Sequence, residues 1–245
     1  MGGLHRSGTT LVADLLAAAP GIGAITGAPV PEQEGVYLQG AIPHGARHGI
    51  PGAFAFDPDQ HLTETSRFNT HEVARRIAAE WDSWYPASPR LRVEKSPVNL
   101  LRSRLYQSLF PTALFVFVIR HPIAVARATA KWSGRAEREL IAHWEQAHDL
   151  LFGDLPHLHN HVLLRYEDLA RDPASQLRRL SAFTGVEIPL PSTPIDNRNA
   201  QYAQPPCDAV FPVARILGYG PDPMHLHPIQ IATGNHYFRS VTEQL

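Results

Sequence analysis

The sequence is poor in cysteine, in long apolar runs and in net charge. Cys207 is the only cysteine among 245 residues, so an internal disulfide is excluded and a reducing compartment, the cytoplasm, is the expected location. The apolar segment Leu11 to Ala19 contains Asp14 and is far shorter than the roughly 18 residues of a membrane span. The formal net charge is −1, which argues against nucleic acid or an anionic membrane as a partner.

The composition is that of an ordinary globular protein. Hydrophobic residues make up 44% of the chain and charged residues 18%. The length suits one large α/β domain, and no internal repeat or low-complexity tract divides it. We therefore expect residues 1–245 to form a single domain.

A phosphate loop is present, but without the lysine of an ATPase. Gly3 and Gly8 have the spacing of a Walker A motif, yet Thr9 stands where the lysine would be. The glycines allow close approach of a phosphate, and the helix expected from Leu11 directs its free N–H groups to the same point. Side-chain donors in the loop are Arg6, Ser7, Thr9 and Thr10. The segment therefore predicts an anion-binding turn.

Three blocks in order resemble one known family. His5-Arg6-Ser7-Gly8-Thr9-Thr10 is similar to the 5′-phosphosulfate loop of sulfotransferases that use 3′-phosphoadenosine-5′-phosphosulfate (PAPS), especially the tyrosylprotein and related bacterial branch. Val118-Ile119-Arg120-His121-Pro122 resembles the 3′-phosphate strand and helix of that family, and Leu164-Arg165-Tyr166-Glu167-Asp168-Leu169 resembles the block that follows. The resemblance implies an α/β, three-layer, P-loop-like fold with a central, mostly parallel sheet flanked by helices.

The resemblance also implies a set of donor-binding residues. The loop residues Arg6, Ser7, Gly8, Thr9 and Thr10 would bind the 5′ end of PAPS, Arg120 the 3′-phosphate, and Tyr166 the adenine. The family usually has a serine eight residues after this arginine, and this chain has Ala128 there. Thr129, one residue later, is expected to supply the missing hydroxyl. PAPS is the implied co-substrate, and no metal is required.

Candidate catalytic residues come from two further segments. Lys95 follows the short strand expected from Leu91, and it matches the lysine that faces the transferring sulfuryl group in the tyrosylprotein branch. The long segment 20–70 corresponds to the acceptor site, where that branch has a carboxylate base. Glu32 and Glu34 are both candidates for this base, and Arg6 and Lys95 for stabilising the charge that develops during transfer.

Hydrophobic periodicity and capping residues predict the remaining elements. We expect helices over 70–84, 99–109, 122–132, 135–152 and 173–184, strands over 113–119 and 161–165, and a short strand ending in a turn over 91–97. Only Met1 precedes Gly2, so the strand that normally leads into such a loop does not fit. Either the start of the gene is misplaced and a strand is lost, or a natural truncation leaves the sheet without its middle strand and the two neighbouring strands unpaired.

The sequence leaves several functional alternatives open. The predicted reaction is sulfuryl transfer to a hydroxyl or amine of a small molecule, saccharide or peptide. A P-loop nucleoside or nucleotide kinase is disfavoured by the absent Walker lysine and by the lack of an aspartate after 113–119. A non-catalytic, truncated nucleotide-binding homologue would account for Ala128 and the missing strand. The alternating histidines 157, 159 and 161 have no cysteine or acidic partner nearby, which favours a polar turn over a metal site.

Overall fold

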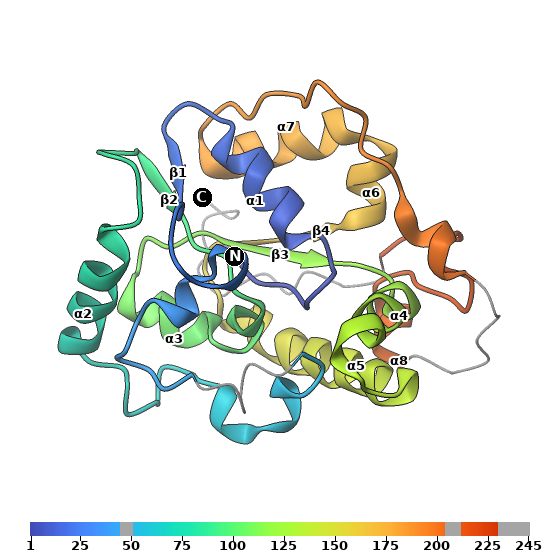
Figure 1. Ribbon diagram of the computed structural model, residues 1–245, viewed down its shortest axis with the longest axis horizontal. Helices are drawn as coiled ribbons and strands as arrows, with labels where there is room; N and C mark the ends of the chain where they lie inside the picture. The colour runs from blue at the N-terminus through green and yellow to red at the C-terminus, as the bar shows by residue number, and fades with distance from the viewer. Residues whose placement is uncertain (45–50, 204–211, 230–245) are drawn as a thin grey trace, which may run out of the picture.

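The fold is built on two short pairs of parallel strands (Figure 1). The computed structural model describes residues 1–44, 51–203 and 212–229, so Cys207 lies outside the described residues. β1 (Ile22–Ala24) pairs with β2 (Leu91–Val93), and β3 (Phe115–Ile119) pairs with β4 (His161–Arg165). The predicted strands over 113–119 and 161–165 are confirmed. β1 was not predicted, because three residues are too few to show a pattern.

Met1 and Gly2 lie between the two strand pairs and connect them. Gly2 exchanges two backbone hydrogen bonds with β3, at 3.0 and 2.9 Å. On the other side, the α-amino group of Met1 donates to the Glu94 carbonyl at 2.7 Å, and the Met1 carbonyl accepts from the Ser96 N–H at 3.4 Å. These two residues hold the position of a middle strand. A pocket of about 570 Å³ is lined by Met1 and by residues of both β2 and β3.

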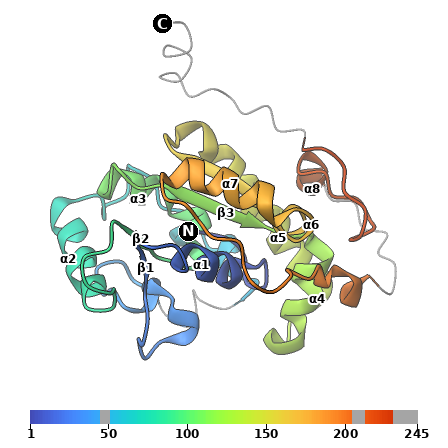
Figure 2. The same ribbon diagram turned by 90° about the horizontal axis from the view of Figure 1, so that it is seen from above.

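The side chains of β3 alternate between two hydrophobic cores, one on each face of the strand layer. Val116 and Val118 pack with α1 (Thr9–Ala17) and α7 (Pro173–Thr184). Phe115, Phe117 and Ile119 pack on the opposite face with α3 (Ser103–Leu109) and α5 (Glu137–Asp154). Figure 1 shows α1 and α7 on one side of β3 and α3 and α5 on the other, and Figure 2 shows these elements from the side of α1 and α7. A run of apolar residues without alternation is what a strand covered on both faces requires.

The other elements surround this centre. The remaining helices are α2 (His71–Asp82), α4 (Pro122–Ser133), α6 (Tyr166–Arg171) and α8 (Pro212–Ile216), and the one-turn helices are η1 (Pro31–Gln33), η2 (Gly35–Tyr37), η3 (Phe54–Phe56), η4 (Pro58–Gln60), η5 (Pro97–Leu101), η6 (Leu155–His157) and η7 (Arg198–Tyr202). Within the described ranges, no helix combines the length and the apolar character needed to cross a bilayer.

Helix ends follow the capping residues in the sequence. The Thr70 hydroxyl accepts from the Val73 N–H at 3.2 Å, and the Asp172 carboxylate accepts from the Ser175 N–H at 3.0 Å. Each such cap stabilises its helix by about 1 kcal/mol. Gly185 ends α7 with a φ of 68°, a left-handed conformation that glycine adopts without strain. Two expectations differ: the strand β2 ends at Val93, and the helix expected over 99–109 is divided between η5 and α3, which begins only at Ser103.

Three buried histidines couple folding to pH. His121, His143 and His148 are at most 2% exposed. Burial lowers the pKa of His121 and His148 to about 4 and that of His143 to about 3. These imidazoles are therefore neutral in the folded protein at neutral pH, whereas in the unfolded chain they bind protons below about pH 6.5.

We expect the free energy of unfolding to fall as pH drops from 6.5 toward 4. In this window the unfolded state binds more protons, and each buried imidazole contributes a loss of up to about 1.4 kcal/mol per pH unit. Urea unfolding at a series of pH values measures this slope. His148→Phe keeps a ring against Trp144 but cannot titrate. The slope of its unfolding free energy against pH should therefore correspond to about one bound proton fewer than in the wild type. Equal slopes for the two proteins would contradict the assignment.

Candidate functional site

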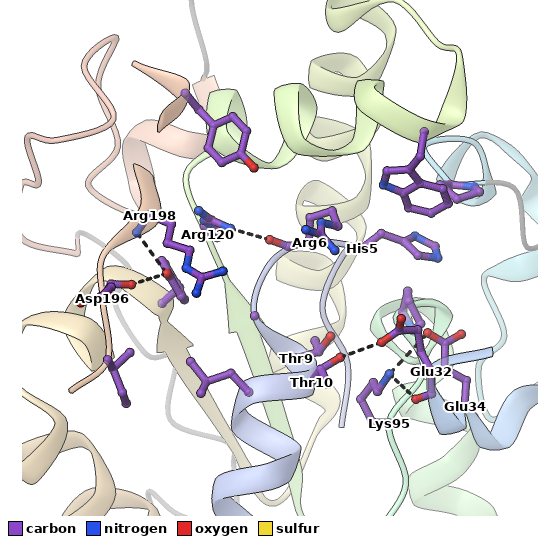
Figure 3. A pocket seen from close by; sticks show the side chains of 18 of the residues that line it. His5, Arg6, Thr9, Thr10, Glu32, Glu34, Lys95, Arg120, Asp196 and Arg198 are labelled. Atoms are coloured by element: carbon purple, nitrogen blue, oxygen red, sulfur yellow. Dashed lines mark hydrogen bonds and ion pairs between the residues drawn. The ribbon is translucent and has the colours of Figure 1, made fainter. Parts of the chain in front are cut away.

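A pocket of about 950 Å³ opens at the C-terminal ends of β2 and β3. Open parallel sheets bind their ligands at this edge. Figure 3 shows Arg120 and Arg198 at one end, Glu32, Glu34 and Lys95 at the other, and Arg6, Thr9 and Thr10 between them. The structure thus brings together most of the candidate residues. Those that line the pocket are Arg6, Gly8, Thr9, Thr10, Glu32, Glu34, Lys95, Arg120 and Tyr166.

The loop between Gly2 and α1 presents free backbone donors to the pocket. Gly8 has a φ of 100°, and a Cβ there would lie 2.9 Å from the Tyr166 ring, so only glycine fits. Helix α1 begins at Thr9 with no side-chain cap and no acidic residue in its first turn. Its first N–H groups therefore have no helical partner and carry the positive end of the helix dipole. This arrangement is suited to an anion.

Arg120 is a buried cation with a donor to spare. Its Nη1 donates to the Arg6 carbonyl at 3.0 Å, and its Nε donates to the Asn199 side-chain oxygen at 2.9 Å. The guanidinium lies 4.3 Å from the centre of the Tyr166 ring, and burial lowers its pKa from the usual value. Its Nη2 is buried without a hydrogen-bond partner. An anion in the pocket would supply that partner and offset the desolvation of the charge.

The segment 191–202 closes the Arg120 end of the pocket. The Tyr166 hydroxyl donates to the Asp196 carbonyl at 2.7 Å and accepts from the Arg198 N–H at 3.2 Å. The Asn199 amide donates to the buried Glu167 carboxylate at 2.7 Å. Burial raises the pKa of Glu167, and its hydrogen bonds oppose this rise. Tyr166 and Glu167 of α6 thereby hold the segment in place.

Glu34 and Lys95 form a buried pair at the other end. The Lys95 Nζ lies 3.6 Å from the Glu34 Oε1, and both side chains are about 7% exposed. Nζ also donates to the Glu32 carbonyl at 2.7 Å. Burial raises the pKa of Glu34 to about 7, although the Lys95 charge lowers it. Such a carboxyl is poised to accept a proton near neutral pH.

The residues on either side of Lys95 fix the backbone around Glu34. The Glu94 Oε1 accepts from the Gly35 N–H at 3.0 Å, and the Ser96 Oγ accepts from the Val36 N–H at 3.1 Å. Three successive residues after β2 thus hold the loop. Glu32 differs from Glu34, because it is exposed and its carboxylate accepts a long bond of 3.4 Å from the Thr10 hydroxyl.

An uncharged aromatic wall continues the pocket beyond this pair. The rings of His5 and Trp132 meet edge to face, with centroids 5.7 Å apart. Burial, with smaller effects from Lys95 and His44, lowers the pKa of His5 to about 4, so its imidazole is neutral. The Trp132 side chain is half exposed and lines the pocket.

Ser7 and Thr129 do not reach the pocket. Thr129 is 2% exposed and faces a small cavity beside Leu4 and His143. Successive helical residues are turned by about 100°, and the pocket side of α4 is that of Ala128, which packs against Tyr202. Ser7 is also buried, and its hydroxyl has no hydrogen-bond partner. Among the described residues, no three potential metal ligands gather at one point.

Comparison with known proteins settles the family. The sulfotransferase family model matches residues 1–189. The chain belongs to the sulfotransferase family. The sulfotransferase domain of the Synechococcus PCC 7002 olefin synthase is 18% identical, over 89% of this chain and 93% of that one, with a TM-score of 0.56. The sulfotransferase domain of the curacin biosynthetic pathway is 18% identical, over 78% and 76%, with a TM-score of 0.46. No curated protein matches the chain.

Family membership implies transfer of a sulfuryl group, and the first structural likeness shows a P-loop-like α/β fold. The family match ends at residue 189, so the segment 191–202 of this sulfotransferase lies beyond it. Sequence reasoning missed Arg198 and Asn199 in that segment, because a proline-rich polar stretch carries no periodic signal. Asn199 bonds Glu167, 32 residues away, and only the folded chain shows this pairing.

In this sulfotransferase, Lys95→Met should raise the pKa of Glu34 above about 7. The Lys95 charge favours the ionised carboxyl, so its loss leaves burial to act unopposed. A carbon-13 NMR titration of the glutamate carboxyls measures the change, with Glu34→Gln assigning the resonance. Glu32→Gln, which removes a nearby negative charge, should shift the pKa of Glu34 downward instead. A lower pKa in Lys95→Met would contradict this account.

Proposed function

We propose that the protein transfers a sulfuryl group from PAPS to an acceptor hydroxyl or amine by in-line displacement. The observation that carries this proposal is the free, buried Nη2 of Arg120, which lies in the same pocket as the uncapped start of α1. PAPS has two anionic ends, the 5′-phosphosulfate and the 3′-phosphate. Two separate anion-binding features in one pocket match this pattern.

The residues divide between these ends. Arg6, Thr9, Thr10 and the N–H groups of α1 would bind the 5′-phosphosulfate, which supplies the group to be transferred. Arg120 would bind the 3′-phosphate through Nη2, with Arg198 adding charge at the same end. Tyr166 offers its ring to the adenine, because its hydroxyl is already bonded to segment 191–202. Serine and threonine hydroxyls at Ser7 and Thr129 take no part in this assignment.

Glu34 is the base in the proposed transfer. It accepts the proton of the acceptor hydroxyl as the acceptor oxygen forms its bond to sulfur. The bond between sulfur and the bridging phosphate oxygen breaks, and its electron pair stays on the phosphate. Lys95 and Arg6 stabilise the charge on the sulfuryl oxygens and on the leaving phosphate. The products are a sulfate ester and adenosine 3′,5′-bisphosphate.

Glu34 is preferred to Glu32 because of its surroundings. Its carboxyl is buried beside Lys95 and has a pKa of about 7, whereas Glu32 is exposed. The paired lysine and carboxylate also support the likeness to the tyrosylprotein branch. The acceptor, a small molecule, saccharide or peptide, would lie against His5 and Trp132, where the wall is aromatic and uncharged.

The donor site is tested by calorimetric titration with adenosine 3′,5′-bisphosphate, beside ATP with Mg²⁺. We expect selective binding of the bisphosphate. Arg6→Ala and Arg120→Ala should each weaken it roughly 10- to 100-fold, since a hydrogen bond to a charged group contributes about 1.5–3 kcal/mol. Arg76→Ala, a control on the exposed face of α2, should bind as the wild type does. Wild-type affinity in both pocket variants, or preference for ATP, would refute the donor assignment.

The base is tested by the pH dependence of transfer. Only the ionised carboxylate accepts a proton, so kcat should rise with pH through about 7 and then level off. Glu34→Gln should abolish this rise and lower kcat by roughly 10²- to 10⁴-fold. Glu32→Gln should keep the pH-dependent rise. The proposal for Glu34 fails if its removal leaves the profile intact and that of Glu32 does not.

A further inference from the structure

The loop that carries Glu34 contains two successive residues in a rare backbone conformation. Glu32 has a φ of 50° and Gln33 a φ of 55°, in the left-handed region that residues other than glycine seldom adopt. Two such residues in a row persist only where the surrounding structure enforces them. The Lys95 Nζ, which donates to the Glu32 carbonyl, fixes this turn from the pocket side.

The side chain of Gln33 fixes the same turn at a second point. Its Oε1 accepts from the Ala28 N–H at 2.8 Å, and its Nε2 donates to the Ala28 carbonyl at 2.9 Å. Ala28 is buried, and the Gln33 amide forms both of the backbone hydrogen bonds that a neighbouring strand would otherwise form with it. Gln33 itself does not line the pocket.

We propose that Gln33 is a positioning residue for Glu34, holding the strained turn that places the Glu34 carboxyl in its buried site beside Lys95. This inference rests on the proposed role of Glu34 as the base. Gln33 contacts neither the donor nor the acceptor region. It acts only through its own backbone, which directly precedes Glu34 in the chain.

The charged and titratable groups around Glu34 come from two elements. Lys95 and Glu94 face it from the segment after β2, and Glu32 and Tyr37 face it from its own loop. Gln33 is neutral, and its amide pairs with the backbone of Ala28. A neutral replacement of Gln33 therefore moves Glu34 relative to these groups without adding or removing a charge.

Gln33→Met is the primary test, because methionine has a similar length but cannot form either bond to Ala28. The turn should relax and expose the Glu34 carboxyl to water, which moves its pKa down toward the ordinary value. We expect the pH-dependent rise of kcat to shift about one unit or more to lower pH and its plateau to fall about tenfold. The affinity for adenosine 3′,5′-bisphosphate should not change.

Gln39→Met is the matched control. Gln39 also bonds backbone groups of this loop, since its amide donates to the carbonyls of Val36 and Ile42 and accepts from the Ile42 N–H. Its replacement should lower the melting temperature and leave the pH profile unchanged. A profile shift of the same size in both variants would reduce Gln33 to a structural residue and overturn the proposal.

A carbon-13 NMR titration of Glu34 provides a readout that needs no turnover. The pKa of Glu34 should fall in Gln33→Met and stay near the wild-type value in Gln39→Met. This result would support the positioning role even if no acceptor is found. If Gln33→Met fails to fold, Gln33→Asn replaces it, because asparagine tolerates the left-handed backbone but its amide is too short to reach Ala28. An unchanged Glu34 pKa in a folded Gln33 variant would overturn the proposal.

Discussion

A buried positive charge with neutral partners is the constraint on which the pocket depends. Arg120 directly follows β3, and its guanidinium is held by a loop carbonyl, an amide oxygen and an aromatic face. None of these partners carries a negative charge, so the cost of burying the cation is only partly offset. The same contacts join the loop before α1, the helix α6 and the segment 191–202. A bound anion would therefore complete the electrostatics of three separate parts of the chain.

The opposite end of the pocket is organised by backbone contacts. Glu94, Lys95 and Ser96 follow β2, and each binds a different backbone position in the loop 32–36. The residues that follow a strand of only three residues thus hold in place a loop that has little regular structure of its own. This arrangement explains how a carboxyl can be buried beside a lysine in a region rich in proline and glycine. The loop is fixed by hydrogen bonds from the strand end and by Val36, which is buried in the hydrophobic core.

The sequence predicted what depends on neighbouring residues and missed what depends on distant ones. The buried strand at 115–119 and the caps at Thr70, Asp172 and Gly185 were predictable, because composition and local hydrogen bonding define them. The loop, Arg120 and Lys95 were found by resemblance and do line one pocket. The sequence could not distinguish Glu32 from Glu34, because only the folded chain shows that Glu34 is buried and Glu32 is exposed. Thr129 was chosen because it follows Ala128 in the sequence. Successive residues of a helix are turned by about 100°, so the Thr129 side chain points into the core and not into the pocket.

The segment 191–202 has a consequence for how quickly ligands exchange. It lies over one end of the pocket and is held there by the Tyr166 hydroxyl and by the Glu167–Asn199 bond. A ligand would leave this end more readily if these hydrogen bonds broke. The residence time of a ligand would therefore depend on the opening of segment 191–202 as well as on the strength of the ligand's own contacts. Glu167 does not line the pocket, yet its substitution would alter the rate at which a ligand dissociates from this end.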